Sequence, residues 1–376
     1  MAAAASEMTV TTAGVIPVAA EVLPVAVLEA FGLEAYSSER ELGGLINRTF
    51  LARDPAGQFR AVVQRLHPIF AAEVNIDIEA VTEHLARAGM VTPRLVRTRD
   101  GARWFEHDGG VWRALTYVEG VTLHRMPDGA HARAAGELVG RFHLAMRDLQ
   151  HTFAFQRVNV HDTTGHLRKL AQAARGGAAP PAPATPSSGN AALTAEATEL
   201  ARRILDAGAR LPPLGDLPRR VMHGDLKVSN VRFAPPPAVT AICLIDLDTL
   251  GPQNIAYELG DGLRSWCNPE GEDTSETRFE LAIFAAALEG YAAGAAGLLS
   301  AAEIEAILPG LETDCLELAA RFCVDVFEDR YFGWNPDRFS SRRQHNLVRA
   351  QGQLALALAV GASRPSARAA VQAAFG

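Results

Sequence analysis

The alternation of hydrophobic and polar positions divides the chain into a strand-rich first third and a largely helical remainder. Two alternating segments separated by an Asp-Pro-Ala-Gly turn predict a β-hairpin over residues 43–66. Apolar residues at helical spacing then predict a helix over residues 73–88, and further strands follow before residue 118. A strong amphipathic pattern over residues 130–149 begins a series of helices. The pattern indicates an α+β fold with a β-rich N-terminal part and a mostly helical C-terminal part.

Two segments interrupt the helical remainder. Residues 175–190 are rich in proline and glycine and have few side chains able to build a core, which predicts a flexible insertion. Residues 231–233 and 239–245 are rich in β-branched and apolar side chains and flank an Ala-Pro-Pro-Pro turn, which predicts a second hairpin. Later apolar patterns predict helices over residues 276–293, 302–308 and 311–326.

Composition and charge narrow the class of protein. The 376 residues include 48% hydrophobic and 21% charged side chains, which is typical of a globular chain long enough for two lobes. The net charge of −7 argues against nucleic acid or an anionic membrane as the main partner. The four cysteines lack C-x-x-C spacing, and no segment has the pattern of a targeting peptide or a membrane span. We therefore expect a cytoplasmic protein, monomeric or homodimeric, without a disulfide framework or a zinc site.

Candidate chemistry centres on the segment His-Gly-Asp-Leu-Lys-Val-Ser-Asn at residues 223–230. Asp225 is a candidate to accept the proton of a hydroxyl group, and Lys227 can reach the phosphate groups of a nucleotide. Asn230 and Asp246, which follows an apolar run, offer the hard oxygen ligands that suit Mg²⁺. Because the second hairpin returns the chain on itself, we expect Asn230 and Asp246 to be neighbours. Together these residues predict a phosphoryl-transfer site.

The two segments resemble the catalytic loop and the metal-binding aspartate of protein-kinase-like phosphotransferases, specifically the aminoglycoside phosphotransferase family. The resemblance implies ATP and Mg²⁺ as cofactors and a hydroxyl group of a small polar molecule as acceptor. It also implies a two-lobed protein-kinase-like fold, with a flexible N-terminus at residues 1–22, a nucleotide-binding N-lobe at 23–118 and a catalytic, acceptor-binding C-lobe at 119–376. Two further polar residues receive structural roles: Asp261 as an anchor of the catalytic loop and His143 as a packing residue.

The first hairpin and the helix after it provide candidate nucleotide contacts, with one departure from the family pattern. Gly43 and Gly44 would let backbone N–H groups approach the phosphates, and a simple turn is the alternative. The strand position that usually carries a phosphate-binding lysine holds Gln64, and Arg65 points to the opposite face by strand alternation. Glu79 is a candidate carboxylate for orienting the phosphate-binding residue, and a solvated helix face is the alternative.

Backbone groups of residues 116–118 (Thr116, Tyr117 and Val118) are expected to bond the adenine edge at the hinge between the lobes. The Asn-x-Thr of Asn47 and Thr49, followed by Val-Gln-Arg, resembles the N-acetylhexosamine 1-kinase branch of the family. A looser resemblance to the C-terminal stretch of that branch implies substrate contacts for Arg321 and Tyr331.

Three functional interpretations follow. The first interpretation is a kinase whose acceptor is a sugar or amino sugar, such as an N-acetylhexosamine. The alternative within the class is an aminoglycoside, choline or homoserine. Four carboxylates could supply negative charge for a cationic acceptor of this kind: Glu258, Asp325, Glu328 and Asp329. From another class, a nucleotide-binding pseudokinase acting as an interaction module is suggested by the missing strand lysine, whereas the intact Asp225, Asn230 and Asp246 favour an enzyme.

Overall fold

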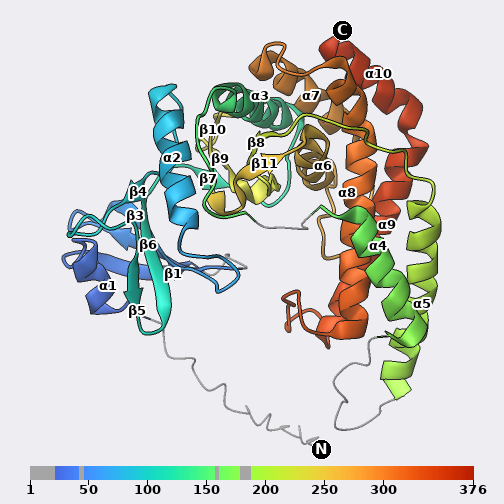
Figure 1. The fold of residues 1–376 in the computed structure, drawn as a ribbon, viewed down its shortest axis with the longest axis horizontal. Coiled ribbons are helices and arrows are strands. Elements are labelled where there is room, and N and C mark those ends of the chain that lie inside the picture. Colours follow the sequence, from blue (N-terminus) through green and yellow to red (C-terminus); the bar gives the residue numbers. More distant parts are fainter. Residues whose placement is uncertain (1–21, 42–45, 157–160, 178–187) are drawn as a thin grey trace, which may run out of the picture.

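The computed structural model describes residues 22–41, 46–156, 161–177 and 188–376 (Figure 1). The predicted flexible N-terminus, the glycine pair Gly43 and Gly44, and most of the predicted insertion at 175–190 lie outside these ranges. No helix in the described part of the chain is both long enough and apolar enough to cross a membrane. All four cysteines are buried and carry free thiols.

A six-stranded antiparallel sheet forms the centre of the N-lobe. Its strand order is β1-β2-β3-β6-β4, and β5 pairs with β6. The strands are β1 (Ser37–Glu41), β2 (Arg48–Arg53), β3 (Phe59–Arg65), β4 (Leu95–Val96), β5 (Phe105–His107) and β6 (Gly110–Thr116). Two helices accompany the sheet, α1 (Val25–Ala30) and α2 (Val74–Arg87). The predicted hairpin and helix are therefore confirmed, and the further strands expected before residue 118 are β4, which spans only two residues, β5 and β6.

Strand alternation decides which side chains the two faces of this sheet carry. Phe50, Val63 and Ala114 are buried on one face, where they form a small core with Val27 of α1. The opposite face carries Gln64, whose cross-strand partners are Thr49 and Arg113. This polar face is turned toward the helical part of the molecule, as its contacts described below show.

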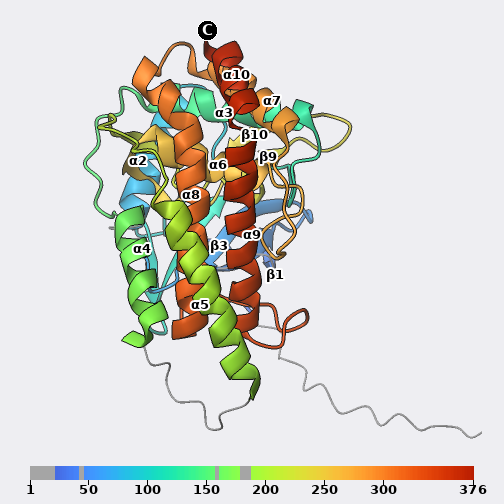
Figure 2. The ribbon, with the colours of Figure 1, turned by 90° about the vertical axis from the view of Figure 1, so that its right-hand side faces the viewer.

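The C-lobe consists mainly of helices (Figures 1 and 2). They are α3 (Gly129–Met146), α4 (Thr163–Gln172), η1 (Ala173–Gly177), α5 (Ser188–Gly208), α6 (Ile255–Trp266), α7 (Leu281–Ala295), α8 (Ala301–Glu328), α9 (Arg342–Ala362) and α10 (Arg364–Phe375). Figure 2 shows α4, α5, α8 and α9 running alongside one another. Their apolar faces share one large core with α3, α6 and α7.

Short strands carry the loops of the central motif within this helical lobe. Strands β7 (Val121–Thr122), β9 (Val231–Phe233) and β10 (Ala241–Leu244) form one small antiparallel sheet. Strands β8 (Arg220–Met222) and β11 (Gly251–Gln253) form a second pair. The predicted hairpin between residues 231 and 245 is thus confirmed as β9–β10.

One helix is longer than its sequence pattern indicated. The two helices expected over 302–308 and 311–326 are a single helix, α8, with Pro309 inside it. Tertiary packing overrides the proline because α8 lies between α6 and α9. A Cβ at Gly310 would meet the carbonyl oxygen of Ala256 at 2.2 Å, so the glycine permits this close approach. Helix α7 begins at Leu281, five residues later than predicted.

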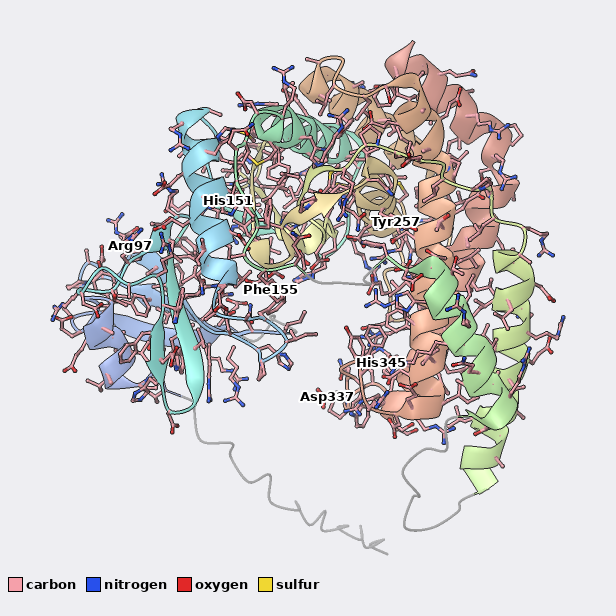
Figure 3. The ribbon with its side chains drawn as sticks, in the orientation of Figure 1. Arg97, His151, Phe155, Tyr257, Asp337 and His345 are labelled. Atoms are coloured by element: carbon pink, nitrogen blue, oxygen red, sulfur yellow. The ribbon has the colours of Figure 1, made fainter. Side chains whose placement is uncertain are left out.

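The chain passes from the N-lobe sheet to the C-lobe between Thr116, where β6 ends, and Val121, where β7 begins. Arg232 of β9 donates hydrogen bonds to the carbonyl oxygen of Val118 at 3.0 Å and to the hydroxyl of Tyr117 at 3.1 Å. Asp77 of α2 also connects the two lobes. Its carboxylate accepts hydrogen bonds from the ring of His151 and from the backbone nitrogen of Phe155, two residues labelled in Figure 3.

Candidate active site

The loop over residues 223–230 is held by one face of α6. Asp261 accepts a hydrogen bond from the backbone nitrogen of Leu226 at 2.8 Å, and the hydroxyl of Ser265 accepts one from Val228 at 3.1 Å. The indole of Trp266 donates to the carbonyl oxygen of Leu226 at 2.7 Å. Residues three or four apart share a helix face, so these side chains fix successive points of the loop. The predicted anchoring role of Asp261 agrees with this contact.

Glu258, one turn earlier on α6, fixes the start of the loop. Its carboxylate accepts hydrogen bonds from the backbone nitrogens of His223 and Gly224, both at 2.8 Å. The ring of His143 lies 3.1 Å from the same carboxylate and 3.0 Å from the hydroxyl of Tyr291. Burial would raise the pKa of Glu258, but its bond to His143 and the nearby histidine charges lower it. His143 is therefore a packing residue that supports the loop, as predicted.

Gly224 allows the loop to turn toward the second aspartate segment. Its φ angle of +80° lies in the left-handed region, and a Cβ there would meet the carbonyl oxygen of Thr249 at 2.6 Å. The hydroxyl of Thr249 donates to the carbonyl oxygen of His223 at 2.8 Å. The loop and the residues after Asp246 are thus in direct backbone contact.

Asp225, Lys227 and Asn230 converge within this loop. The ammonium group of Lys227 lies 2.6 Å from Oδ2 of Asp225, and the amide nitrogen of Asn230 donates to the same oxygen at 3.0 Å. That nitrogen also donates to the backbone carbonyl of Asp225 at 2.8 Å. The side chain of Asp225 is 26% exposed, so a small hydroxyl compound can approach it.

Asp246 reaches the same group of residues from the end of β10. The backbone nitrogen of Ile245 donates to the carbonyl oxygen of Asn230 at 2.9 Å, which makes the two segments neighbours as the hairpin predicted. The carboxylate of Asp246 lies 3.9 Å from the ammonium group of Lys227. Its φ angle of 64° is unusual for a residue other than glycine, which marks this turn as one held by its surroundings.

The three charged groups have different proton affinities. Burial would raise the pKa of Asp225, but Lys227 and the Asn230 amide lower it overall. The carboxylate is therefore ionised and can accept a hydrogen bond from a hydroxyl group. Burial raises the pKa of Asp246 to about 6, and the carboxylates of Asp248 and Asp225 add to this shift against the attraction of Lys227. The pKa of Lys227 is raised by both aspartates despite its burial.

These residues fit a divalent cation. The carboxylates of Asp225 and Asp246 lie 2.6 Å and 3.9 Å from the single ammonium group of Lys227, so one negative charge is left over, and a cation would balance it. The amide nitrogen of Asn230 is committed to Asp225, so its amide oxygen is the atom that can act as a ligand. Carboxylate and amide oxygens are the ligands that Mg²⁺ prefers.

On the N-lobe side, three of the predicted nucleotide residues take part in one polar network. The amide nitrogen of Gln64 donates to the hydroxyl of Thr49 at 3.0 Å, and its amide oxygen accepts from Arg113. The amide nitrogen of Asn47 donates to the carboxylate of Asp248 at 2.5 Å. The sheet therefore contacts the loop that carries Asp246 through side chains of its polar face.

Two other predicted nucleotide residues point elsewhere. Arg65 lies on the face opposite Gln64, as alternation predicted, and donates to the carbonyl oxygen of Asp108 at 3.1 Å. The carboxylate of Glu79 binds Arg97 at 2.8 Å and Arg103 at 2.6 Å, so the expected contact with a phosphate-binding residue of β3 is wrong. The reason is tertiary: the segment between β4 and β5 places these two arginines beside α2.

Three of the backbone groups expected to bond adenine have partners within the protein. The nitrogen of Thr116 donates to the carbonyl oxygen of Arg94 at 2.8 Å, and the nitrogen of Tyr117 donates to that of Arg60 at 2.9 Å. The carbonyl oxygen of Val118 accepts from Arg232, although a carbonyl oxygen has a second lone pair. Bonding of an adenine edge at this hinge stays a prediction.

Arg321 and Tyr331 both contact the ring of Phe332. The guanidinium of Arg321 lies 5.7 Å from the ring centre of Phe332, and Tyr331 packs edge-on against the same ring at 4.8 Å. Tyr331 is 53% exposed. Their role as substrate contacts stays a prediction.

The four carboxylates considered for a cationic acceptor have other partners. Asp325 is 1% exposed and accepts from the backbone nitrogens of residues 330–332 and from Asn346, so it closes the turn after α8. Glu258 holds the catalytic loop, and Glu328 pairs with Lys169 and Arg330. Asp329 pairs with Arg342 at 3.9 Å. Acceptor binding by Glu258 or Asp325 is therefore wrong.

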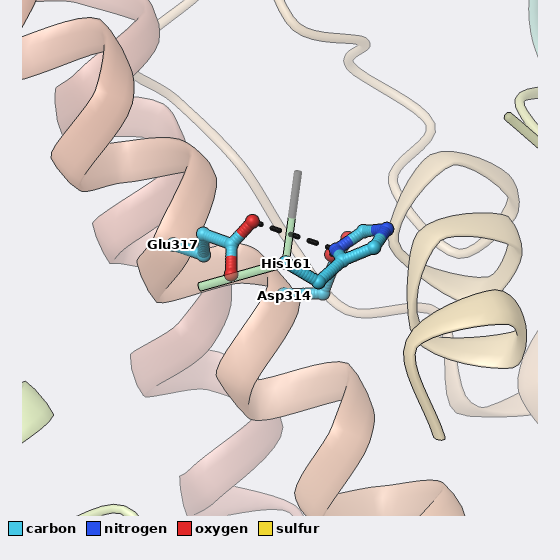
Figure 4. Close-up of side chains that lie close together, drawn as sticks. All are labelled: His161, Asp314 and Glu317. Atoms are coloured by element: carbon cyan, nitrogen blue, oxygen red, sulfur yellow. Dashed lines mark ion pairs between the residues drawn. The ribbon is translucent and has the colours of Figure 1, made fainter. Parts of the chain in front are cut away.

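A different acidic cluster lies behind the catalytic loop. Nδ1 of His161 lies 3.4 Å from Glu317 and 3.6 Å from Asp314, both on α8 (Figure 4). Tyr257 of α6 stacks on the imidazole at 4.5 Å (Figure 3). Burial and then Asp261 raise the pKa of Asp314 to about 7. Burial lowers the pKa of His161, but Glu317 and Asp314 raise it overall.

Sequence reasoning missed several residues of the site. His223 accepts from the backbone nitrogen of Asp225 at 3.3 Å and lies 2.9 Å from the carbonyl oxygen of Ile245, so it joins the two segments. Its place directly before Gly-Asp was a usable signal. Asp248 is the second aspartate of the Asp-Leu-Asp segment, but its partner could not be read from the sequence. Arg113 and His161 carried no local signal, because their partners lie far away in the sequence.

Comparison with known proteins agrees with this geometry. A model of the phosphotransferase enzyme family, known as APH, matches residues 39–297. A homoserine kinase of Bradyrhizobium sp. (strain ORS 278) is 33% identical over 268 residues, covering 70% of this chain and 72% of that protein. A homoserine kinase of Bradyrhizobium sp. (strain BTAi1) is 30% identical over 228 residues, covering 60% of this chain and 61% of that protein. The chain thus spans about three fifths to seven tenths of the length of these relatives.

Among solved structures, an amicoumacin kinase in complex with AMP-PNP, Ca²⁺ and Ami superposes with a TM-score of 0.56 at 16% identity. The superposition covers 88% of this chain and 90% of that one. This likeness confirms the predicted protein-kinase-like fold. The family match confirms the predicted phosphotransferase enzyme. The chain belongs to the phosphotransferase enzyme family.

Proposed function

We propose that the protein transfers the γ-phosphoryl group of ATP to the hydroxyl group of a small amino alcohol such as homoserine, with Mg²⁺ as the metal. The convergence of Asp225, Lys227, Asn230 and Asp246 supports the reaction most directly. The homoserine kinases similar to this chain support the acceptor. The complex of the amicoumacin kinase with AMP-PNP and Ca²⁺ supports a nucleotide and a divalent cation.

Each residue of the loop has one task in this reaction. Asp225 orients the acceptor hydroxyl and takes its proton as the phosphoryl group moves. Its lowered pKa keeps it ionised near neutral pH, and Lys227 keeps it in place. Asn230 and Asp246 would hold Mg²⁺, which neutralises the phosphate charge when bound. Lys227 adds positive charge beside the transferred group, so positioning and charge balance supply most of the acceleration.

The acidic cluster at His161 supports an acceptor that carries an ammonium group. Glu317 and Asp314 are 2% and 7% exposed, and Asp261 adds a third carboxylate beside the catalytic loop. Two of the three carboxylates share one guanidinium, that of Arg264, and Glu317 pairs with histidine rings, so this cluster carries surplus negative charge. A cationic group near it would be favoured, and a neutral sugar would gain nothing from the charge.

An N-acetylhexosamine is the second candidate acceptor. One observation favours it: Arg321 and the exposed Tyr331 gather around Phe332, which offers an aromatic surface and hydrogen-bond donors for a sugar ring. The sequence resemblance to N-acetylhexosamine 1-kinases points to the same two residues.

Release of ADP with Mg²⁺ and ATP tests these acceptors together. We expect turnover with homoserine to exceed that with N-acetylglucosamine, an aminoglycoside and choline. Glu317→Gln should raise the KM for an amino alcohol. The matched control is Glu312→Gln on the same helix, because Glu312 pairs with Arg364 of α10, and this change should leave the KM unaltered. Highest turnover with N-acetylglucosamine would establish the second candidate. Binding of ATP without turnover on any acceptor would instead support a pseudokinase.

A further inference from the structure

A buried arginine of the N-lobe sheet holds the turn that carries Asp246. Arg113 lies in β6, and its side chain is 1% exposed. Its guanidinium forms a two-pronged pair with the carboxylate of Asp248: Nη1 binds Oδ1, and Nη2 binds Oδ2 at 2.9 Å. Asp248 belongs to the short helix η3 (Leu247–Thr249), which begins directly after Asp246. A bidentate pair fixes both distance and orientation between its partners.

A second N-lobe residue binds the same carboxylate. The amide nitrogen of Asn47 donates to Oδ2 of Asp248 at 2.5 Å. The amide oxygen of Asn47 accepts from the backbone nitrogen of His67 at 2.9 Å, which fixes the orientation of the amide. Asp248, which is 2% exposed, therefore receives hydrogen bonds from two separate segments of the N-lobe.

The residue at the usual lysine position orients the arginine. The amide oxygen of Gln64 accepts from Nε of Arg113 at 2.9 Å and from Nη2 at 2.6 Å. Gln64 and Arg113 are direct cross-strand partners of β3 and β6. The other end of the Gln64 amide donates to Thr49 on β2. Three adjacent strands thus hold the guanidinium in one orientation.

Burial decides what Arg113 can do. Four of its five N–H donors are used within the protein, two on Asp248 and two on Gln64. A guanidinium that is 1% exposed has no surface to offer to a nucleotide phosphate. Removing one partner of such a pair leaves an uncompensated buried charge, so the arrangement strongly favours one position of η3.

We propose that Arg113 is a positioning residue that acts through Asp248 to hold Asp246 in place for the metal ion. In this arrangement the N-lobe sheet supplies a buried cation for the metal-binding turn in place of a strand lysine that contacts phosphate. Phosphate charge is left to the metal ion and Lys227. The inference rests on the proposed function for its link to turnover, but the link to metal binding can be tested without an acceptor.

Binding of Mn²⁺ in the presence of ADP, measured by electron paramagnetic resonance, tests the inference directly. Arg113→Met and Asp248→Asn should each weaken Mn²⁺ affinity about 10- to 100-fold. The double variant should be no weaker than the weaker single variant, because both changes break one connection. Arg113→Lys keeps the charge but loses the two-pronged geometry, so it should give an intermediate affinity.

Arg364→Met is the matched control, because Arg364 forms a similar two-pronged pair with Glu312 between α10 and α8. It should leave Mn²⁺ affinity unchanged. Unaltered Mn²⁺ affinity in Arg113→Lys and Arg113→Met, with loss only in Asp248→Asn, would overturn the inference and make Asp248 a metal ligand. If Arg113→Met does not fold, Arg113→Lys and Asn47→Ala decide the question by the same measurement. Absence of turnover on every acceptor would overturn the proposed function but leave this test intact.

Discussion

Asp261 of α6 accepts a hydrogen bond from the backbone nitrogen of Leu226 at 2.8 Å, while its other carboxylate oxygen accepts one from Arg264 at 2.8 Å. One partly buried side chain therefore joins α6 to the residue that follows Asp225. Catalytic groups positioned by a rigid helix keep their geometry better than groups on a free loop. The site depends on α6 as much as on the loop itself.

Replacing this carboxylate tests the dependence. Asp261→Asn keeps one acceptor oxygen but places an amide nitrogen against either Leu226 or Arg264, both of which are donors. We expect kcat to fall roughly 10- to 100-fold, because a small displacement of Asp225 removes its alignment with the acceptor. The KM for ATP should change little. Steady-state kinetics of Asp261→Asn test this, with Asp206→Asn, a change at an exposed carboxylate of α5, as the control. An unaltered kcat in Asp261→Asn would contradict the anchoring role.

Gly224 offers a test of close backbone approach. Gly224→Ala forces a side chain into a φ of +80° and brings its Cβ to 2.6 Å from the carbonyl oxygen of Thr249. Gly57→Ala is the matched control, since its φ is also +80° but nothing lies within 4 Å of the added Cβ. Both changes should lower the free energy of unfolding, measured with urea, by about 1–2 kcal/mol through backbone strain. Only Gly224→Ala should lose more stability than this strain explains, and only Gly224→Ala should lose turnover. Equal losses of stability in the two variants would contradict the close approach of Gly224 to Thr249.

The cluster around His161 predicts a pH dependence of stability. Burial and Asp261 raise the pKa of Asp314 to about 7, and Glu317 and Asp314 raise that of His161 against the effect of burial. Both groups bind protons more tightly in the folded state than in the unfolded state. The stability that they contribute is therefore present at low pH and is lost as pH rises through the folded pKa values.

Urea unfolding between about pH 5 and about pH 8 measures this contribution. The free energy of unfolding in wild type should fall more steeply with pH than in Asp314→Asn, by up to about 1.4 kcal/mol per pH unit for one proton. Asp206→Asn should keep the wild-type slope. Parallel slopes in wild type and Asp314→Asn would show that Asp314 does not bind the proton.

The central part of the site could be predicted because its determinants are local. Asp225 and Asn230 lie in one loop, and a short hairpin brings Asp246 back to them, so sequence spacing alone indicated their proximity. The anchoring contact of Asp261 followed from the family resemblance. The α+β fold was predictable for the same reason, since strand alternation and helical spacing are short-range patterns.

The connection between the lobes could not be predicted in this way. Arg113 and Asp248 are 135 residues apart, and an arginine on a strand usually faces solvent. Glu79 shows the reverse case, in which a plausible site residue is bound by arginines from a later segment. Asp325 likewise was a candidate to bind a cationic acceptor, but it closes the turn after α8. Pairing with charged or polar groups far away in the sequence determines what these side chains contact. A single sequence does not show such pairs.

The most direct test of Asp225 as the proton acceptor compares the Asp225→Asn variant with wild type. Phosphoryl transfer is followed with radiolabelled ATP, and the affinity for ATP is measured by calorimetry. The change removes the proton acceptor but keeps a side chain of the same shape beside Lys227 and Asn230. We expect a loss of turnover of about 10²- to 10⁴-fold with almost unchanged affinity for ATP. Turnover equal to that of wild type would remove Asp225 from the reaction and contradict the account.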